Sequence, residues 1–358
     1  MFRFLALILS LSITVFSFSS AFANPYIVVD VQTGRVLAHN EAFDRWYPAS
    51  LTKLMTAYVT FRALQRGEIS LETPIRITTT AAQLPPSKSG YKAGSTLTLD
   101  TALKIMMVKS ANDIATSIGT AVGGSDDAFV ARMNSEATRI GMVGSHFANA
   151  SGLPDPANYS TARDLAVLAA QIRREFPQYA HYFNIPAIDY GNGAKLVPNT
   201  NNLIGRFNGA DGMKTGFICS SGFNLAASAT RKGRIIVAVV LGAERIDQRE
   251  GLSAQLLNDG FKSAGSQQLT LVTLRPYGSK LSQATDLRQT ICTETAWQER
   301  LQYRDENGKI QFSSPFMSAL DINNIAAIPV RLLAAPPVLK AGQVPDWKVP
   351  VPVAKPSF

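Results

Sequence analysis

Residues 46–53 read Trp46-Tyr47-Pro48-Ala49-Ser50-Leu51-Thr52-Lys53 and place a lysine three positions after a serine, just past a proline. A proline is typical of a helix start, and the pattern that follows predicts a helix from Leu51 to about Gln65. Ser50 would then lie in the first turn, where unpaired backbone amides and the helix dipole favour a developing oxyanion. An amine at this spacing lies beside the hydroxyl, as a serine nucleophile requires of its base. Taken alone, the string equally fits an ordinary helix start with a surface lysine.

Two further short strings follow. Ser110-Ala111-Asn112 begins 60 residues after Ser50, and Lys214-Thr215-Gly216 begins 104 residues after Ser110. Each is common by itself, because a serine or an asparagine often caps a helix and a lysine beside a hairpin glycine is often a surface residue. Together the three strings predict a serine acyl-transfer site. For Lys53 to act as a base, its pKa must fall well below about 10.4 through burial or a second cation, and Lys214 could be that cation.

The strings resemble the motif set of the penicillin-recognising serine enzymes. Within that group the chain resembles the serine-type D-alanyl-D-alanine carboxypeptidases, the low-molecular-mass penicillin-binding proteins of peptidase family S11, over about Pro25 to Ala264. Further landmarks of the resemblance are Trp46-Tyr47-Pro48-Ala49, His146-Phe147, Ser151-Gly152-Leu153, Tyr159-Ser160-Thr161-Ala162-Arg163-Asp164, Gly222-Phe223-Asn224 and Arg249. One departure is Phe217, which stands directly after the third string where some members carry a histidine, so any role of that imidazole is absent here.

The resemblance implies a role for each catalytic residue. Ser50 would be the nucleophile and Lys53 its base, while Ser110 would relay a proton toward the leaving amine. Asn112 would contact both the substrate backbone and Lys53 through its amide.

The third string is predicted to lie on a strand that binds substrate. An edge strand can pair with an extended peptide, and Lys214 and Thr215 would hold the terminal carboxylate, with Arg249 nearby. Gly216 would let the two backbones approach closely. The backbone amide of Phe217 would complete an oxyanion hole with that of Ser50.

The implied function is that of a serine D,D-carboxypeptidase. It would remove the terminal D-alanine from peptidoglycan stem pentapeptides through an acyl-enzyme, and β-lactams would acylate the same serine as covalent inhibitors. The alternatives are a D,D-endopeptidase that cleaves peptidoglycan cross-links, a transpeptidase, a β-lactamase and a non-catalytic cell-wall or penicillin-binding protein. A β-lactamase is less favoured because the sequence has no clear ExxLN element, and five intact site residues argue against a scaffold.

The order of predicted elements indicates an α/β (α+β) fold. Strands are expected at both ends of the chain's main part, with helices between them, so one antiparallel sheet would be flanked by a helical cluster, as in the β-lactamase/transpeptidase-like architecture. Predicted strands cover Tyr26–Asp30, Arg35–Ala38, Gly212–Phe217, Gly222–Ser228 and Ile235–Leu241; predicted helices cover Leu51–Gln65, Asp100–Val108, Asp113–Val122, Asp126–Ile140, Thr161–Ile172 and Gln248–Lys262.

The chain divides into three predicted parts. Residues 1–23 have a basic start, an apolar run and the small-residue site Ala21-Phe22-Ala23, which predict a signal peptide and an exported, periplasmic protein; a retained anchor is the alternative. Residues 24–264 would form the D,D-peptidase domain. Residues 265–358 would form a C-terminal extension, with seven prolines from Pro329 to Pro356 that predict an extended or disordered tail.

Composition excludes some classes of function. The net charge is +9, but Lys and Arg are scattered, so no nucleic-acid partner is expected, while weak association with a membrane surface stays open. Histidines 39, 146 and 181 are far apart, so neither a metal nor another cofactor is expected. Cys219 and Cys292 either pair in the oxidising compartment or remain free thiols, and the sequence does not decide between the two. The sequence does not predict the oligomeric state of the protein either.

Overall fold

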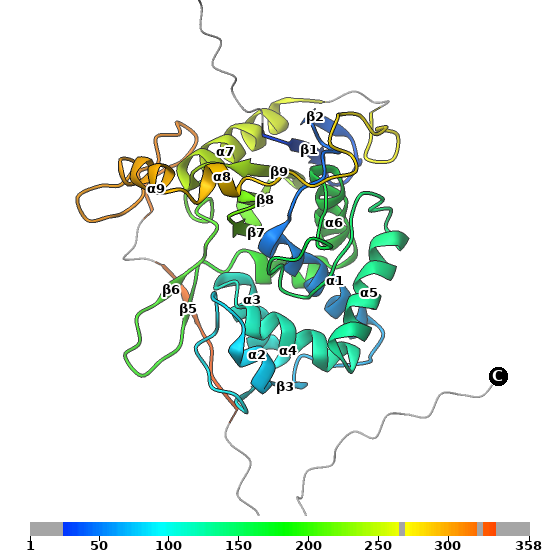
Figure 1. Cartoon of the computed structure of the whole chain (residues 1–358), viewed down its shortest axis with the longest axis vertical. Coiled ribbons are helices and arrows are strands. Elements are labelled where there is room, and N and C mark those ends of the chain that lie inside the picture. The colour runs from blue at the N-terminus through cyan, green and yellow to red at the C-terminus, as the bar shows by residue number, and fades with distance from the viewer. Residues whose placement is uncertain (1–23, 265–268, 321–324, 334–358) are drawn as a thin grey trace, which may run out of the picture.

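The computed structural model describes residues 24–264, 269–320 and 325–333, and its centre is a five-stranded antiparallel sheet. The strand order is β2-β1-β9-β8-β7, so the N-terminal hairpin pairs with the last long strand and β7 forms an edge (Figure 1). The strands are β1 Tyr26–Asp30, β2 Val36–Asn40, β7 Ala210–Ile218, β8 Gly222–Arg231 and β9 Arg234–Ala243. This arrangement confirms the predicted antiparallel sheet closed by strands from both ends of the main part.

The sheet is buried on both faces, and β9 shows why. Val237, Val239 and Leu241 pack into the core beneath the helical cluster, whereas Ile236 and Ala238 pack into a second core under the last long helix. Side chains alternate between the faces of a strand, so a continuous apolar run is what a strand covered on both sides requires.

Seven α-helices of five or more residues flank the sheet within residues 24–264. They are α1 Thr52–Gln65, α2 Thr79–Gln83, α3 Leu99–Val108, α4 Asn112–Gly123, α5 Asp126–Arg139, α6 Ala162–Glu175 and α7 Ile246–Lys262, with α9 of the extension described below. Helix α7 packs on β8 and β9 from one side, and α6 packs on β9 and β1 from the other. Six of these helices were predicted within a few residues; the short α2 was not.

Helix α1 runs through the middle of the helical cluster (Figure 1). Most of its residues are buried, including Thr52, Lys53, Thr56 and Thr60, so it has no solvent-facing polar stripe. A helix that is covered all round is positioned by tertiary packing, not by its own amphipathicity. The side chains it carries are therefore held in fixed positions.

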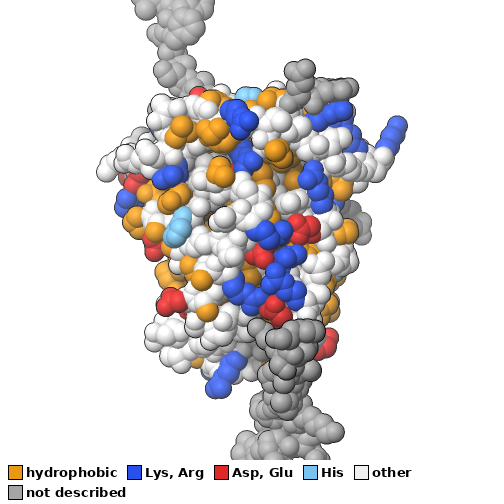
Figure 2. Space-filling view, turned by 90° about the vertical axis from the view of Figure 1, so that its right-hand side faces the viewer, with side chains coloured by type: hydrophobic (Ala, Val, Ile, Leu, Met, Phe, Trp, Pro, Cys, Tyr) orange, Lys and Arg blue, Asp and Glu red, His pale blue; other side chains and the backbone are white. Residues whose placement is uncertain are grey.

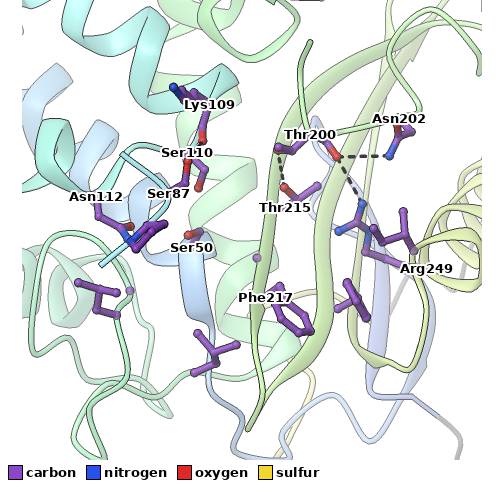
Figure 3. A pocket seen from close by; sticks show the side chains of 17 residues that line it. Ser50, Ser87, Lys109, Ser110, Asn112, Thr200, Asn202, Thr215, Phe217 and Arg249 are labelled. Carbon is purple, nitrogen blue, oxygen red and sulfur yellow. Dashed lines mark hydrogen bonds between the residues drawn. The ribbon is translucent and has the colours of Figure 1, made fainter. Parts of the chain in front are cut away.

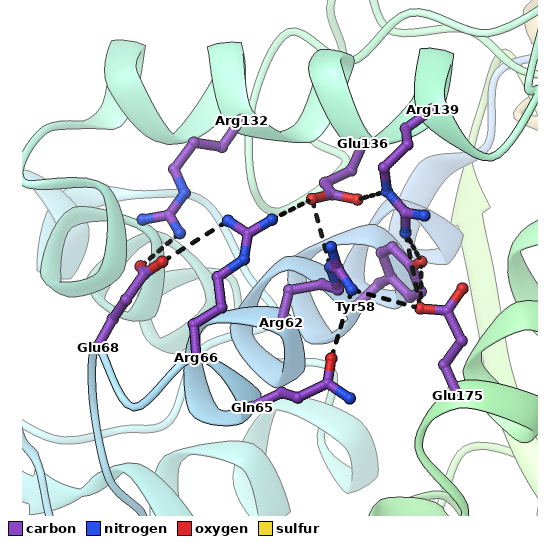
Figure 4. A network of polar contacts seen from close by, with 9 residues as sticks. All are labelled: Tyr58, Arg62, Gln65, Arg66, Glu68, Arg132, Glu136, Arg139 and Glu175. Atoms are coloured by element: carbon purple, nitrogen blue, oxygen red, sulfur yellow. Dashed lines mark hydrogen bonds and ion pairs between the residues drawn. The ribbon is translucent and has the colours of Figure 1, made fainter. Parts of the chain in front are cut away.

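A polar network ties α1 to α5 and α6 (Figure 4). The Tyr58 hydroxyl of α1 donates a hydrogen bond of 2.9 Å to Glu175 Oε2 of α6, and Arg139 of α5 contacts the same hydroxyl. Burial and the Glu175 carboxylate raise the pKa of Tyr58, which keeps it protonated as a donor. The other members are Arg62, Gln65, Arg66, Glu68, Arg132 and Glu136. Each partly exposed pair contributes only about 0–1 kcal/mol, so the network serves mainly to orient the three helices.

Several short elements were not predicted. The strands β3 Pro74–Arg76 and β4 Thr96–Thr98 form a small ribbon, and β5 Ala187–Asp189 lies between β6 Val197–Pro198 and β10 Ala327–Pro329. The remaining elements are the 3₁₀ turns η1 Ala49–Leu51 and η2 Pro177–Phe183 and the helices α8 Arg288–Ile291 and α9 Glu294–Leu301. The extension thus contains ordered structure that its weak sequence pattern did not indicate.

A disulfide between Cys219 and Cys292 joins the end of β7 to the segment just after α8. The pairing, which the sequence left open, is therefore formed. Backbone hydrogen bonds fasten the same region, because Leu287 N donates to Ser220 O at 3.0 Å and Thr285 N donates to Arg45 O at 3.1 Å. The first half of the extension is thereby held against the main part of the chain.

Some predictions concern residues outside this description. The signal peptide at 1–23 lies outside the described residues, as do residues 334–358 of the proline-rich tail. The division into three parts stays a prediction.

Among the described helices, none combines the length and the apolar character that a membrane crossing would demand. On the face shown in Figure 2, Lys and Arg side chains are interspersed with Asp and Glu.

Candidate active site

A cleft of about 620 Å³, here called the Ser50 cleft, opens between the helical cluster and the β7 edge (Figure 3). Its lining contains seven of the nine predicted site residues: Ser50, Ser110, Asn112, Thr215, Gly216, Phe217 and Arg249. The other two, Lys53 and Lys214, are buried behind the surface at 0% and 1% exposure. The structure therefore brings the three sequence strings together in one place.

Ser50 lies on the 3₁₀ turn η1, directly before α1. Two glycines allow the neighbouring segments to reach this turn. A Cβ on Gly152 would lie 1.8 Å from the carbonyl oxygen of Ala49, and a Cβ on Gly216 would lie 2.7 Å from the carbonyl oxygen of Pro48 and 3.0 Å from the amide nitrogen of Ser50. Since real Cβ atoms do not approach so closely, only glycine permits β7 and the loop at 152 to enclose the serine.

Lys53 Nζ has three partners. It lies 3.0 Å from Ser50 Oγ, 2.7 Å from Asn112 Oδ1 and 2.5 Å from Ser151 O. The Asn112 amide is fixed in this orientation because its Nδ2 donates to Pro85 O at 3.0 Å. Two of the three partners can only accept hydrogen bonds, so a neutral amine would use both its hydrogens on them. Its lone pair would then be left for the Ser50 proton.

Electrostatics favour that neutral form. Complete burial lowers the pKa of Lys53 well below its ordinary value, and the nearby Lys214 lowers it further, while Asp113 acts in the opposite direction. Burial also lowers the pKa of Lys214 to about 7, with a second contribution from Arg249. The sequence analysis gave burial or a second cation as the possible causes, with Lys214 as the candidate cation, and both act on Lys53.

Ser110 occupies the loop between α3 and α4 with a φ of 61°, a left-handed conformation uncommon for serine. Its Oγ is buried and has no hydrogen-bond partner among the described residues. The N-cap of α4 is Ala111, without a side-chain cap, so neither Ser110 nor Asn112 serves the capping role that was the alternative. The Ser110 hydroxyl is thus held at the cleft by its backbone and is left available to a ligand.

The opposite wall is built from the β7 edge and the start of α7. Thr215 Oγ1 lies 2.7 Å from Thr200 Oγ1, and Arg249 donates to Thr200 O at 3.4 Å. The Arg249 guanidinium is paired at 2.5 Å with Glu250, which is fully buried. Lys214 donates to Thr215 O at 3.0 Å from behind the strand. This wall therefore carries positive charge and hydroxyl groups, which suit a carboxylate.

Phe217 follows the third string on β7 and is 41% exposed at the cleft. Its ring stacks on Phe223 of the neighbouring strand with centroids 4.3 Å apart. An apolar surface thus stands directly after the third string.

Several lining residues were not identified from the sequence. Thr200 and Asn202 come from the loop before β7, and Ser87 and Lys109 lie on the helical side (Figure 3). The polar run Asn199-Thr200-Asn201-Asn202 was the signal that could have indicated a functional loop. Within the described residues, no group of three His, Cys, Asp or Glu side chains could hold a metal ion.

This arrangement has the parts of an acyl-transfer site. A serine stands beside a buried amine with a lowered pKa, a second hydroxyl is unpaired, and a strand edge with cations lies opposite. Such a site can bind an extended peptide along the edge strand and transfer an acyl group from that peptide to the serine.

Comparisons with known proteins show the family of the chain. The family model described as D-alanyl-D-alanine carboxypeptidase matches residues 15–245. The chain is 33% identical over 247 residues to the D-alanyl-D-alanine carboxypeptidase DacC of Escherichia coli K12, covering 67% of this chain and 61% of DacC. It is 29% identical over 241 residues to DacF of Bacillus subtilis, covering 67% and 62% of the two chains. The match thus spans less than two thirds of the length of these relatives.

Solved structures are similar as well. The D-alanyl-D-alanine carboxypeptidase DacD of Francisella tularensis gives a TM-score of 0.63 at 29% identity, covering 66% of this chain and 69% of that one. Penicillin-binding protein 5 of Haemophilus influenzae gives 0.63 at 32% identity, covering 66% and 70%. The ampicillin-bound penicillin-binding protein D2 of Listeria monocytogenes gives 0.60 at 28% identity, covering 66% and 96%. The chain belongs to the D-alanyl-D-alanine carboxypeptidase family, peptidase family S11.

Proposed function

We propose that this protein is a serine D,D-carboxypeptidase that removes the terminal D-alanine from peptidoglycan stem pentapeptides. The observation that carries the proposal is the hydrogen bonding of Lys53, whose two acceptor partners leave its lone pair for Ser50 Oγ at 3.0 Å. A buried lysine with a lowered pKa is a competent general base near neutral pH.

Acylation would begin when the Lys53 amine accepts the Ser50 proton and Oγ attacks the carbonyl carbon between the two D-alanines. The backbone amides of Ser50 and Phe217 would stabilise the oxyanion, and the closeness of Gly216 to the Ser50 amide supports this assignment. The C–N bond then breaks, and Ser110 would pass the proton to the departing amine. Water would hydrolyse the acyl-enzyme and restore the Ser50 hydroxyl.

The terminal carboxylate of the substrate would lie against the β7 wall. Thr215 and Arg249 line that wall and Lys214 lies directly behind it, so the carboxylate would meet two cations and a hydroxyl. Asn112 on the helical side would bind the substrate backbone across the cleft. The bound stem would thus be held between two walls, with its scissile carbonyl at Ser50.

β-Lactams would acylate Ser50 as covalent inhibitors. Their amide resembles the D-Ala-D-Ala bond, and the similar Listeria protein has been solved in ampicillin-bound and cefotaxime-bound forms. The predicted signal peptide would place the enzyme in the periplasm with its peptidoglycan substrate.

The test is a Ser50→Ala variant compared with the unaltered protein on a defined stem pentapeptide and on isolated cell wall. Loss of alanine release with retained wall binding supports the proposal, because the alteration removes one oxygen atom only. Unchanged hydrolysis would reject Ser50 as nucleophile. If the unaltered protein binds cell wall but neither releases alanine nor forms a penicillin adduct, it is a non-catalytic binding protein.

A further inference from the structure

A cavity of about 320 Å³, here called the amino-terminal cavity, lies where β1 begins. Four parts of the chain line it: the residues before β1, the segment after β2, the end of β9 and the first half of the extension. Its lining shares no residue with that of the Ser50 cleft, so the two are separate sites. The polar and charged residues of the lining include Asn24, Glu41, Asp44, Glu244, Lys280 and Thr285.

Two carboxylates in this cavity are neighbours and lack a cation. A Cβ placed on Gly278 would lie 2.6 Å from Asp44 Oδ1 and 2.9 Å from Glu41 Oε2, so both oxygens adjoin the same point of the backbone. Asp44 is only 4% exposed, and its buried Oδ1 has no hydrogen-bond partner within the described residues. In that part of the chain, no ion pair joins Asp44, Glu41 or Glu244 to a Lys or Arg. A buried carboxylate that stays ionised needs a cation, so the cavity favours a positively charged ligand.

A hydroxyl group in the cavity is also unpaired. The Oγ1 atom of Thr285, which belongs to the extension, is buried and has no partner among the described residues. Its backbone holds it in place, because Thr285 N donates to Arg45 O at 3.1 Å. A carboxylate oxygen only accepts hydrogen bonds, and a hydroxyl oxygen can accept them as well. The expected ligand is therefore a cation with several hydrogen-bond donors, which describes an ammonium group.

The pairing of β1 places a nitrogen of the chain itself at this cavity. Tyr26 pairs with Asn40 of β2 on one side and with Val240 of β9 on the other. Antiparallel partners run in opposite directions, so two residues before Tyr26 the chain stands beside the segment just after β2 and the end of β9. Asn24 thus lies between the two segments that carry the three carboxylates.

Asn24 is fixed in this position by contacts with both neighbouring strands. Its side-chain Nδ2 donates to Leu241 O at 2.9 Å, and its carbonyl oxygen accepts a hydrogen bond of 3.3 Å from Asn40 Nδ2. The next residue is held as well, because Leu241 N donates to Pro25 O at 3.0 Å. The start of β1 therefore keeps Asn24 at the cavity.

Asn24 is also the residue that the predicted removal of the signal peptide would make the first of the mature chain. The string Ala21-Phe22-Ala23 predicts hydrolysis of the bond between Ala23 and Asn24 by the signal peptidase of the export pathway. Before cleavage the Asn24 nitrogen is a neutral amide. Water supplies a hydroxyl to the Ala23 carbonyl carbon and a proton to the Asn24 nitrogen, and the proton released by the new carboxyl group completes the ammonium. An ordinary α-amino group has a pKa of about 7.7–8.0.

We propose that the α-ammonium group of mature Asn24 binds in the amino-terminal cavity as the cation partner of Asp44. The proposal rests on the predicted cleavage after Ala23 and is independent of the chemistry at Ser50. The ammonium group can donate three hydrogen bonds to the carboxylates and to Thr285 Oγ1. Because Thr285 belongs to the extension, the bound terminus joins the sheet to the extension. Removal of the signal peptide thereby completes a contact that the precursor cannot form.

The other titratable groups around the cavity do not take this place. Lys280 lines the cavity, but its side chain is exposed and forms no ion pair with the carboxylates. Burial raises the pKa of Tyr277, and the charges of Glu41 and Asp44 raise it further, while a backbone hydrogen bond with Ala42 acts in the opposite direction. Tyr277 Oη is already engaged, because it lies 2.5 Å from the Nδ1 atom of His39.

The first experiment measures the pKa of the α-amino group in the exported and processed protein. Trace acetylation with acetic anhydride across a pH series, read by mass spectrometry of the tryptic peptide 24–35, gives this value. The carboxylates should raise the pKa of the α-amino group by about 1 unit or more above 7.7–8.0. Asp44→Asn and Glu41→Gln should each lower it toward the ordinary range. Glu72→Gln is the charge-matched control, because Glu72 is exposed and does not line the cavity.

The second experiment moves the charge along the chain. A form of the protein that retains Ala23 has a neutral amide at Asn24, and it should melt about 2 °C or more below the processed protein. In the Asp44→Asn background, retention of Ala23 should have little further effect, since the partner of the ammonium group is already gone. In the Glu72→Gln background the full difference should remain. The rate of penicillin acylation shows that the Ser50 site of each form is folded.

An ordinary α-amino pKa in the processed protein would overturn the proposal. A melting difference of the same size with and without Asp44→Asn would also overturn it, as would an exported protein whose first residue is not Asn24. If added calcium chloride raises the melting temperature of both forms equally, the carboxylates bind a metal ion and the proposal fails. None of these results bears on the proposed carboxypeptidase, which fails only if the processed protein forms no penicillin adduct and releases no alanine.

Discussion

The amide oxygen of Asn112 lies 2.7 Å from Lys53 Nζ and so occupies one of the two hydrogens that a neutral lysine amine possesses. Asn112→Asp would replace this neutral acceptor by a carboxylate at the same place. An anion at that distance raises the pKa of Lys53, typically by 1–3 units, and keeps it protonated at neutral pH. We expect penicillin acylation at pH 7 to fall about 10- to 1000-fold.

A pH series distinguishes this electrostatic effect from simple damage. The ratio of the Asn112→Asp rate to the rate of the unaltered protein should recover as pH rises, since Lys53 of the variant loses its proton at higher pH. Asn112→Ala, which adds no charge, should show no such recovery. Equal pH profiles for the two variants would contradict the role assigned to Lys53.

The pKa of Lys214, lowered to about 7, predicts an alkaline decline in activity. Below that pH the side chain is charged and can attract the substrate carboxylate; above it the cation is lost. Because kcat/KM reports the free enzyme, kcat/KM for a pentapeptide should fall as pH rises through about 7 and beyond. Lys214→Arg retains a cation throughout, so this decline should vanish even though the overall rate drops. A decline that persists in Lys214→Arg would assign it to another group.

Gly216→Ala tests the close approach of β7 to the serine. The new Cβ would lie 2.7 Å from Pro48 O and 3.0 Å from Ser50 N, so the strand must move away. A displacement of this kind costs up to about 100-fold in rate, and we expect penicillin acylation to fall about 10- to 100-fold. Gly251→Ala is the matched control, because its Cβ meets only Ser314 Cβ at 3.8 Å. Equal acylation rates for the two variants would show that the approach is unimportant.

The disulfide predicts two further results. Intact-mass thiol counting of the non-reduced protein should find no free thiol, and finding two would exclude the bond. Cross-links that close a long loop typically contribute about 2–4 kcal/mol, and 73 residues separate the two cysteines here. The Cys219→Ser/Cys292→Ser double variant should therefore melt at a lower temperature. Since the bond lies outside the Ser50 cleft, the penicillin acylation rate of the double variant should change little.

Much of the fold could be predicted because its main elements are long and strongly patterned. The strand from Arg234 buries a continuous run from Ile236 to Ala243, and the helix from Thr52 is 14 residues long without a glycine or proline, so the type of each was evident. Strands such as β5 Ala187–Asp189 have three residues, too few to show a period of two. Helix α9 lies in a segment of weak pattern, and none of its residues is buried.

The residues of the candidate site likewise fall into two groups, those that the sequence identified and those that it did not. Ser50, Ser110 and Lys214 could be identified because they stand in short strings of fixed spacing. Thr200 could not, because its place beside Thr215 at 2.7 Å depends on a loop whose path the sequence does not show. A second cavity, lined by Arg245 and Arg304 among others, escaped prediction for a related reason: residues so far apart in the sequence meet there only through tertiary packing.

The most direct test of the account is mass spectrometry of the purified protein after separate incubation with a defined stem pentapeptide and with penicillin. The account predicts loss of one alanine from the pentapeptide and a penicilloyl adduct that maps to Ser50. An intact pentapeptide together with a protein that carries no adduct, or an adduct on a different residue, would contradict it.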